Sequence, residues 1–343
     1  MTVNRLRVLA LVHRHLIPPA TVEEGTDVTT APWRTEYDVI STMTALGHEV
    51  KTLGVHDDLG ELRRASTEWK PHIAFNLLEA FDDVTIFDQN VVSHLELLKL
   101  SYTGCNPHGL LIARDKSLSK KLLAYHRIAV PAFEVFRIGR PIRRPKRLPF
   151  PLIVKSLTQE ASIGISQASV VDSDEKLKER VTFIHESIGT AAIVEQYIEG
   201  REIYVGVIGN QILQALPVWE LFFTNMPDGA RRIATDRVKW SVKYQKKYGI
   251  ESGPAHEIAG AEADRIQHIC KRAYRALELS GCARIDLRLD EAGTVWVLEA
   301  NPNPQIAKGE DFAASAEKVG IGYEALLQRI INLGLRWQPE SVA

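Results

Sequence analysis

Two consecutive strand patterns near the end of the chain, in which charged residues alternate with apolar ones, constrain the fold most. Residues 283–289 predict one strand and residues 294–298 predict the next, because each segment is short, apolar and bounded by turn-forming residues. The segment 290–293 joins them, and the run Pro302-Asn303-Pro304 ends the second strand and fixes the loop that follows. The chain is therefore predicted to place two strands side by side with charged side chains at fixed positions.

Side chains alternate along a strand, so Arg284, Asp286 and Arg288 share one face of the first strand. Glu299 and Asn301 share one face of the second. If the two segments form a hairpin with these faces aligned, two carboxylates and one amide oxygen meet, and such oxygen ligands suit Mg²⁺ or Mn²⁺ bound with nucleotide phosphates. The alternative is a solvent-facing hairpin with a cross-strand ion pair, and the apolar neighbours of both motifs argue against it.

Three lysines and a loop of small residues indicate anion binding only when they are taken together. Lys155 ends a buried strand pattern, which is costly unless the ammonium reaches water or an anion. Lys116 begins a helix pattern, and Lys243 lies in a segment that we expect to be a long polar loop. Residues 160–164 are small enough for backbone N–H groups to approach a phosphate. Each feature alone is more typical of a solvated surface.

Length and charge restrict the class of protein. With 343 residues, 45% of them apolar, the chain is long enough for two or three domains with a sizeable core. The net charge of −1 gives no broad basic field, so no nucleic-acid partner is expected. The chain has neither an apolar run of membrane-spanning length nor a signal-peptide pattern, so we expect a cytoplasmic protein with no membrane partner. Three widely spaced cysteines predict reduced thiols and no zinc motif.

Strand and helix patterns alternate in the first third of the chain. Strand patterns at 7–12, 48–53 and 73–77, with a helix pattern at 36–46, predict a parallel sheet with helices on its faces. The rest of the chain is predicted as α+β. Its patterns are helices at 114–126, 261–279 and 323–335, a hairpin of 151–155 with 168–171, a strand at 192–195, and a hairpin of 202–208 with 211–216.

Taken in order, these segments resemble the ATP-grasp superfamily, specifically its D-alanine–D-alanine ligase-like branch. The matching motifs span roughly residues 70 to 335 and are Tyr102-Thr-Gly, Asp115-Lys116 with Lys120, Ile153-Val-Lys155, Ser162-Ile-Gly164, Val194-Glu195-Gln-Tyr-Ile-Glu-Gly-Arg-Glu202, Lys243-Tyr244, Arg284-Ile-Asp286 and Leu298-Glu-Ala-Asn301. The resemblance implies an α/β N-terminal domain (1–107), a central ATP-grasp subdomain (108–192) and a C-terminal ATP-grasp subdomain with the metal site (193–343). The two α+β subdomains would clasp ATP.

The resemblance also implies a reaction, in which a carboxylate is activated as an acyl phosphate and then attacked by an amine. The implied cofactors are ATP and two Mg²⁺ or Mn²⁺ ions, and the implied partners are small-molecule or peptide substrates and, in a homodimer, a second copy of the chain. For the nucleotide, the resemblance implies phosphate binding by Lys116 and Lys155, a closing loop at Ser162, Ile163 and Gly164, an adenine hinge at Glu195, Gln196, Tyr197 and Ile198, and ribose binding by Glu202. For the metal ions it implies Asp286, Glu299 and Asn301. It also implies that Lys243 and Arg284 stabilise the transferring phosphoryl group and that Tyr244 is the tyrosine of the mobile loop.

The substrate-binding segments depart from the dipeptide ligases. The chain has His13, Arg14 and His15 where those enzymes carry a Gly-Gly loop and an acidic residue that binds the first amine. Glu310 and Asp311 stand where a Ser-Leu pair holds the second substrate's carboxylate. Two carboxylates repel a carboxylate, so we expect a substrate pair other than D-alanine plus D-alanine.

We expect the substrate near Glu310 and Asp311 to carry an amine, guanidinium or polyol group. We expect the anionic group of the donor substrate to lie near residues 13–15. The alternative for Glu310 and Asp311 is a loop that turns outward into solvent. Two alternatives for the function stay open: a genuine D-alanine–D-alanine ligase, and a non-catalytic nucleotide-binding scaffold. The scaffold requires the loss of a metal ligand or a phosphate lysine, and none of these is missing.

Overall fold

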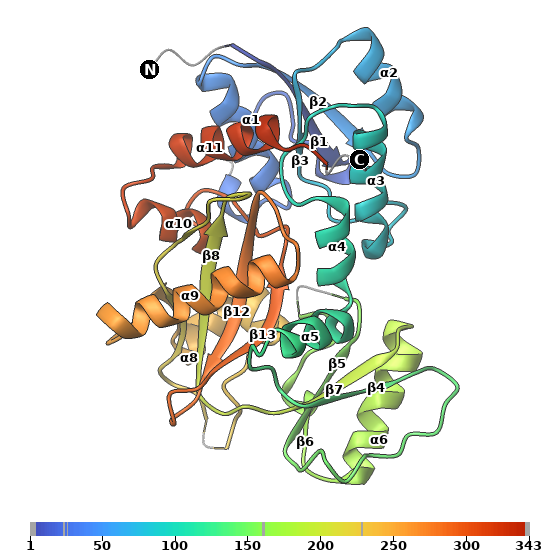
Figure 1. Cartoon of the computed structure of the whole chain (residues 1–343), viewed down its shortest axis with the longest axis vertical. Helices are drawn as coiled ribbons and strands as arrows, with labels where there is room; N and C mark the ends of the chain where they lie inside the picture. Colours follow the sequence, from blue (N-terminus) through green and yellow to red (C-terminus); the bar gives the residue numbers. More distant parts are fainter. Residues whose placement is uncertain (1–4, 23–24, 26, 160–161, 228, 340–343) are drawn as a thin grey trace.

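The N-terminal part of the protein is built on three parallel strands. The computed structural model describes residues 5–22, 25, 27–159, 162–227 and 229–339. β1 (Arg7–His13) lies between β2 (Glu49–Val55) and β3 (Ile73–Asn76), and both pairings are parallel, as the alternating patterns predicted (Figure 1). Residues 8–12 are fully buried, because a parallel sheet is covered on both faces.

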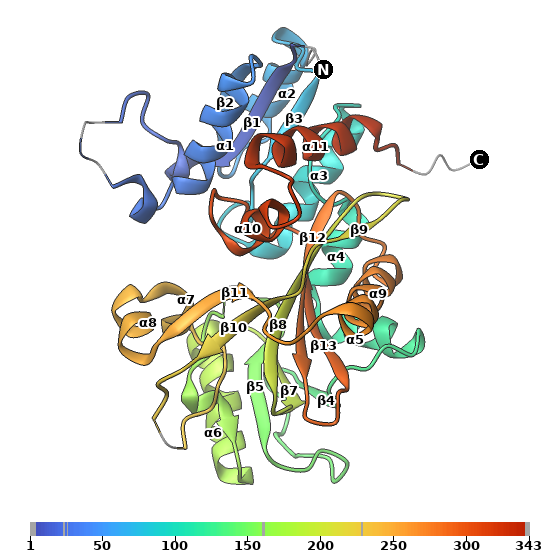
Figure 2. The same ribbon diagram turned by 90° about the vertical axis from the view of Figure 1, so that its left-hand side faces the viewer.

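Helices from both ends of the chain cover this sheet. They are α1 (Arg34–Ala45), α2 (Gly60–Glu68), α3 (Asp88–Leu97) and α11 (Tyr323–Arg336). α11 packs against α1 and β3, and α10 (Asp311–Glu317) lies beside it (Figure 2). The apolar residues of α11 share one core with β1, so the C-terminal helix returns to the N-terminal sheet.

The second sheet has the order β4-β7-β5-β6, and its pairs are antiparallel. Its strands are β4 (Phe133–Phe136), β5 (Leu152–Ser156), β6 (Val170–Val171) and β7 (Ala192–Gln196). α6 (Asp174–Phe183) packs on this sheet, and their apolar side chains form a separate core. The expected subdomain boundary at 192/193 therefore falls at the first residue of β7, which belongs to this sheet.

The third sheet carries the expected charged hairpin. Its path is β11-β10-β8-β12-β13, with β9 paired to β8. The strands are β8 (Arg201–Ile208), β9 (Gln214–Ala215), β10 (Trp219–Phe223), β11 (Ile250–Pro254), β12 (Cys282–Leu289) and β13 (Val295–Asn301). α9 (Gly260–Ala276) packs on it, while α4 (Pro107–Arg114) and α5 (Lys116–Tyr125) connect the first sheet to the second.

The strand and helix patterns predicted from sequence are present in the described residues, with ends shifted by a few positions. The prediction of a long polar loop around residue 243 is wrong, because α7 (Asp236–Trp240) and α8 (Val242–Tyr248) form there, each capped by the hydroxyl that precedes it. Residues 160 and 161 of the expected phosphate loop lie outside the described residues. All three cysteines are free and buried, as expected. Within the described ranges, no helix has the length and apolarity to cross a membrane.

Candidate active site

The charged faces of β12 and β13 align. Asp286 is the cross-strand partner of Glu299, and Arg284 is the partner of Asn301. The register shifts by one residue after Asp286, which places Leu298 in a bulge and lets the strands turn at this point. The two carboxylates and the amide therefore lie on one face of the hairpin, as the alternation of residue types predicted.

Buried ion pairs flank this row of side chains. Arg284 donates two hydrogen bonds to Asp286, with Nε at 2.7 Å and Nη2 at 2.9 Å from the two carboxylate oxygens. Arg288 donates to Glu202 at 2.7 Å, and Glu202 lies opposite it on β8. Burial raises the pKa of Asp286, although the Arg284 guanidinium opposes this shift. Fixed cations therefore neutralise the acidic face before any ligand binds.

A second group of charges surrounds Glu195 at the end of β7. Its carboxylate is only 1% exposed and contacts two ammonium groups, Lys155 Nζ at 3.0 Å and Lys120 Nζ at 3.3 Å. Lys120 also donates to the backbone oxygen of Leu298, at the bulge of β13. Burial opposes ionisation of Glu195, but the two lysines lower its pKa below the usual value. These contacts join the second sheet to the third.

Four lysines converge on Glu299. Lys116 Nζ lies 3.5 Å from its carboxylate. Burial opposes the ionised form of Glu299, yet Lys116, Lys155, Lys239 and Lys120 together lower its pKa to about 2. Glu299 is therefore ionised throughout the physiological pH range, and the positive charges around it exceed its own.

A cavity between the second and third sheets is lined by these charges. Its volume is about 60 Å³, and it brings together most of the residues expected to bind nucleotide. The lining includes Lys155, Ser162, Glu195, Gln196, Tyr197, Ile198, Glu202, Lys239, Asp286 and Glu299. Lys116, whose Nζ contacts Glu299, lies beside it.

The hinge segment after β7 has a defined set of backbone hydrogen bonds. The N–H groups of Gln196 and Tyr197 donate to Ala132 O and Pro151 O, at 2.8 and 3.1 Å. In the described part of the chain, no acceptor lies within hydrogen-bonding distance of the Ile198 N–H, although Ile198 lines the cavity. A planar heterocycle in the cavity can therefore accept a hydrogen bond from the Ile198 N–H without breaking a hydrogen bond of the sheet.

Two loops meet over this cavity. Ser162 Oγ donates to Ala234 O at 2.7 Å. Gln167 exchanges two hydrogen bonds with the backbone of Arg231, both at 2.9 Å. Gly164 has φ +72°, which favours glycine, and Ile163 lines the larger cavity next to it. The loop predicted to close over phosphates is thus fixed to the segment that leads into α7.

Lys239, and not the expected Lys243, lines the cavities around the hairpin. Lys239 lines the 60 Å³ cavity and two larger cavities beside it, and Trp240 lines these two larger ones. Lys243 is exposed and Tyr244 stacks on Tyr248, and neither is among the lining residues of these three cavities. The segment contains two Lys-aromatic pairs four residues apart, Lys239-Trp240 and Lys243-Tyr244. The sequence pattern of the two pairs is the same, and they differ in that the first lies on α7 and the second on α8.

The two larger cavities adjoin Arg284, and Glu310 and Asp311 face one of them. This cavity, of about 620 Å³, is lined by both residues and by Arg34. Arg34 Nη1 lies 2.7 Å from Glu310 Oε1, and Asp311 Oδ1 accepts from Ser252 Oγ at 2.7 Å. Both residues therefore line a cavity, and a cation that the sequence did not reveal already meets Glu310.

The other large cavity, of about 360 Å³, contains two acidic residues that sequence analysis missed. Glu36 and Glu79 line it together with Arg284, Glu299 and Asn301. Glu36 is 5% exposed, and among the described residues its Oε2 has no hydrogen-bond partner. Burial raises its pKa to about 7, and Glu79 adds to the shift. No sequence pattern signals these residues, because they approach the hairpin only through the packing of the first sheet.

Residues 13–15 stay at the edge of this cavity. Leu16, which directly follows them, is a lining residue, whereas His13, Arg14 and His15 are not among its lining. Arg14 lies 3.8 Å from Asp57, and His13 lies 3.5 Å from Asp83. The structure therefore gives His13 and Arg14 acidic neighbours of their own, which disfavours the predicted contact of these two residues with a donor's anionic group.

Comparison with known proteins identifies similar sequences and folds. Residues 122–332 match the family model described as "D-ala D-ala ligase C-terminus". The chain is 32% identical to a D-alanine–D-alanine ligase of Bordetella petrii over 71% of each chain, and 29% identical to the uncharacterized protein y4sG of Sinorhizobium fredii over 89% of each. A solved structure of the D-alanine–D-alanine ligase of Bacillus anthracis, complexed with ATP, superposes with a TM-score of 0.74 at 21% identity, and covers 96% of this chain and 98% of that one.

Proposed function

Because the chain belongs to the D-alanine–D-alanine ligase family of ATP-grasp enzymes, which form C–N bonds with ATP, we propose that it joins a carboxylate to an amine in a pair other than D-alanine plus D-alanine. The observation that carries the substrate part of this proposal is a group of carboxylates in each of two larger cavities, where they stand beside an equal number of Lys and Arg side chains. Glu36 and Glu79 line one of them, and Glu310 and Asp311 line the other. Carboxylates of this kind favour substrates that carry cationic or polyol groups.

ATP would bind at the cavity between the second and third sheets, which has a volume of about 60 Å³ and would have to widen to admit it. The base would accept a hydrogen bond from Ile198 N–H and lie beside Tyr197, and Glu202 would receive the ribose hydroxyls. Lys155 and Lys116 would contact the phosphates. Bound phosphates would share the ammonium groups that now contact Glu195 and Glu299, because each ammonium can donate three hydrogen bonds.

The residues on the hairpin fit a divalent metal. Asp286, Glu299 and Asn301 offer hard oxygen ligands on one face, and Glu299 is fully ionised. Bound Mg²⁺ or Mn²⁺, which we propose as two ions, would neutralise charge on the phosphates. Asp286 is held in place by two hydrogen bonds from Arg284, so its carboxylate is oriented before ligands bind.

Attack of a carboxylate on ATP builds negative charge on several oxygens at once. Lys239 and Arg284 are the cations that line both the hairpin and the larger cavities, so we assign to them the transferring phosphoryl group and the tetrahedral intermediate. Attack by a carboxylate on ATP requires these fixed positive charges and no general acid or base. In this assignment Lys239 replaces Lys243, and Trp240 replaces Tyr244.

The substrate pair is tested by measuring phosphate release from Mg·ATP for each combination of a carboxylate and an amine. One arm of the screen uses substrates with cationic or polyol groups, and the other uses D-alanine alone. The proposal predicts turnover with a member of the first set that exceeds turnover with D-alanine alone at least tenfold. If D-alanine alone supports the fastest turnover, the chain is a genuine D-alanine–D-alanine ligase. Sedimentation of the same sample tests the expected homodimer.

A further inference from the structure

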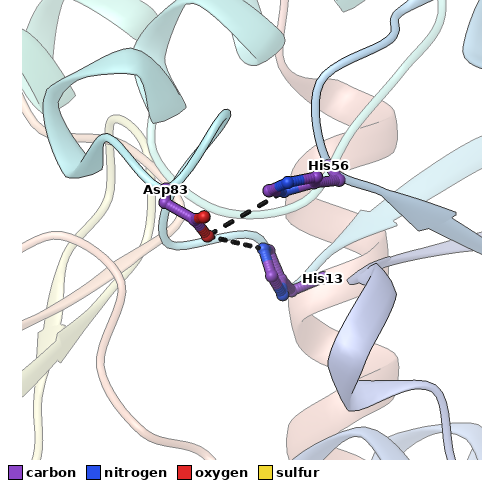
Figure 3. A group of neighbouring side chains, drawn as sticks. All are labelled: His13, His56 and Asp83. Carbon is purple, nitrogen blue, oxygen red and sulfur yellow. Dashed lines mark ion pairs between the residues drawn. The ribbon is translucent and has the colours of Figure 1, made fainter.

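Three side chains from separate segments meet at the carboxyl end of the N-terminal sheet (Figure 3). His13 ends β1, His56 directly follows β2, and Asp83 lies in the turn before residues 85–87. Asp83 Oδ1 lies 3.5 Å from His13 Nε2 and 3.9 Å from His56 Nδ1. The three potential ligand atoms all lie within 4.8 Å of one another. Neighbouring parallel strands end at the same edge of the sheet, which brings these distant residues together.

This geometry is close to that of a metal centre. Nitrogen and oxygen ligands bound at about 2.1 Å in a tetrahedron lie about 3.4 Å apart. The two distances from Asp83 are close to this value, and the ligand atoms of the two histidines lie within 4.8 Å of each other, so the side chains would draw together around an ion. We propose that His13, His56 and Asp83 form a binding site for a transition-metal dication such as Zn²⁺. Imidazole ligands select such ions over Mg²⁺, which separates this site from the oxygen ligands of the hairpin.

An independent observation supports a missing ligand at this position. Among the described residues, His56 Nδ1 is a buried nitrogen without a hydrogen-bond partner. Buried polar atoms are nearly always paired, so an unpaired nitrogen directed at two other ligand atoms requires an explanation. A metal ion would satisfy His56 Nδ1 and Asp83 together.

The alternative is an ion pair between a protonated histidine and Asp83. Metal binding requires the neutral imidazole, whereas the ion pair requires a protonated one. A single carboxylate cannot neutralise two protonated rings, whose centroids lie 5.4 Å apart.

The site is open to incoming ions and adjoins the substrate cavity. The Asp83 side chain is 76% exposed, so an ion can enter from solvent. His15 lies 5.3 Å from His13, ring centroid to centroid, and offers a fourth ligand if its side chain turns. Leu16 and Thr85, which follow His15 and Asp83 closely in the chain, line the 360 Å³ cavity. A bound ion would therefore fix one wall of that cavity.

The test is a Zn²⁺ titration of the untagged full-length protein in excess Mg²⁺, with binding followed by calorimetry. We expect one Zn²⁺ per chain, and at least tenfold weaker binding in His13→Ala, His56→Ala and Asp83→Asn. Asn tolerates the left-handed backbone of Asp83 (φ +56°), so that variant removes the charge and keeps the turn. The matched control is His268→Ala, since His268 is exposed on α9 and lies outside the cluster.

Two results would overturn the site. One is a wild-type protein that binds no Zn²⁺ in excess Mg²⁺. The other is binding that the three variants leave unchanged, because the ion would then lie elsewhere. X-ray absorption on the Zn²⁺-loaded wild type gives an answer that does not depend on any variant folding: two imidazole ligands with oxygen and no sulfur support the site, and fewer than two imidazoles refute it. The variant Glu299→Gln should still bind this Zn²⁺, which distinguishes the site from the proposed catalytic metals.

Discussion

Replacing Lys155 by alanine should destabilise the protein even without nucleotide. The resemblance to ATP-grasp enzymes gave Lys155 only a phosphate-binding role, which predicts little change in the stability of the nucleotide-free protein. In the structure Lys155 Nζ lies 3.0 Å from Glu195, whose side chain is 1% exposed. Removing one partner of a buried ion pair costs about 3–5 kcal/mol. Lys120 retains the other contact with Glu195, at 3.3 Å, so we expect the lower end, about 3 kcal/mol.

The measurement is thermal unfolding with and without Mg·ATP. A loss of about 3 kcal/mol lowers the melting temperature by about 4 °C for a chain of this size. Lys155→Ala should also reduce the further stabilisation that ATP gives, because the phosphate contact is lost. Lys176→Ala is the matched control: Lys176 forms a surface ion pair with Asp172 at 2.8 Å, and its loss should not change the melting temperature measurably.

A double-mutant cycle separates the ion pair from other effects of the substitution. Lys155→Met and Glu195→Gln should show a coupling free energy of at least about 1 kcal/mol, since the residues are in direct contact. An unchanged melting temperature of nucleotide-free Lys155→Ala, together with zero coupling, would refute the reasoning. Lys155 would then be free to serve ATP alone, as the sequence suggested.

Three further predictions concern the hairpin and the cavities beside it. Glu299→Gln should lower ADP release about 100-fold or more while circular dichroism stays unchanged, and wild-type turnover would remove Glu299 from the metal site. Lys239→Ala should lower kcat about 100- to 1000-fold and Lys243→Ala less than twofold, and the reverse order would restore the assignment made from sequence. Glu36 has a pKa of about 7 against an ordinary 4.5, so its stabilising effect is complete below about pH 4.5 and is lost as the pH rises through 7. Between pH 5 and pH 8, urea unfolding should therefore show that the unfolding free energy of the wild type falls by about 3 kcal/mol relative to that of Glu36→Gln. If both proteins changed equally with pH, Glu36 would not have the raised pKa of a buried carboxylic acid.

The sequence predicted the part of the candidate site in which the charged residues follow one another along a strand. The alternation of Arg284, Asp286 and Glu299 with apolar residues contains enough information to place them on aligned faces, and the register confirms the alignment. The segment around residue 240 was harder, because Lys239-Trp240 and Lys243-Tyr244 have the same local pattern. Only the capping of α7 and α8 by Thr235 and Ser241 decides which lysine faces the hairpin.

The substrate cavities could not be predicted, because no single segment contains them. Arg34 and Glu310 are 276 positions apart and meet only because α10 and α11 return to the N-terminal sheet. Glu36 reaches the hairpin through the same packing, since it lies on α1 and α11 packs against α1. In the proposed function, nucleotide binding depends on local motifs within the second and third sheets, whereas substrate choice depends on contacts between those sheets and the first. Substitutions in the first sheet and its helices can therefore change the substrate while leaving every nucleotide-binding motif intact.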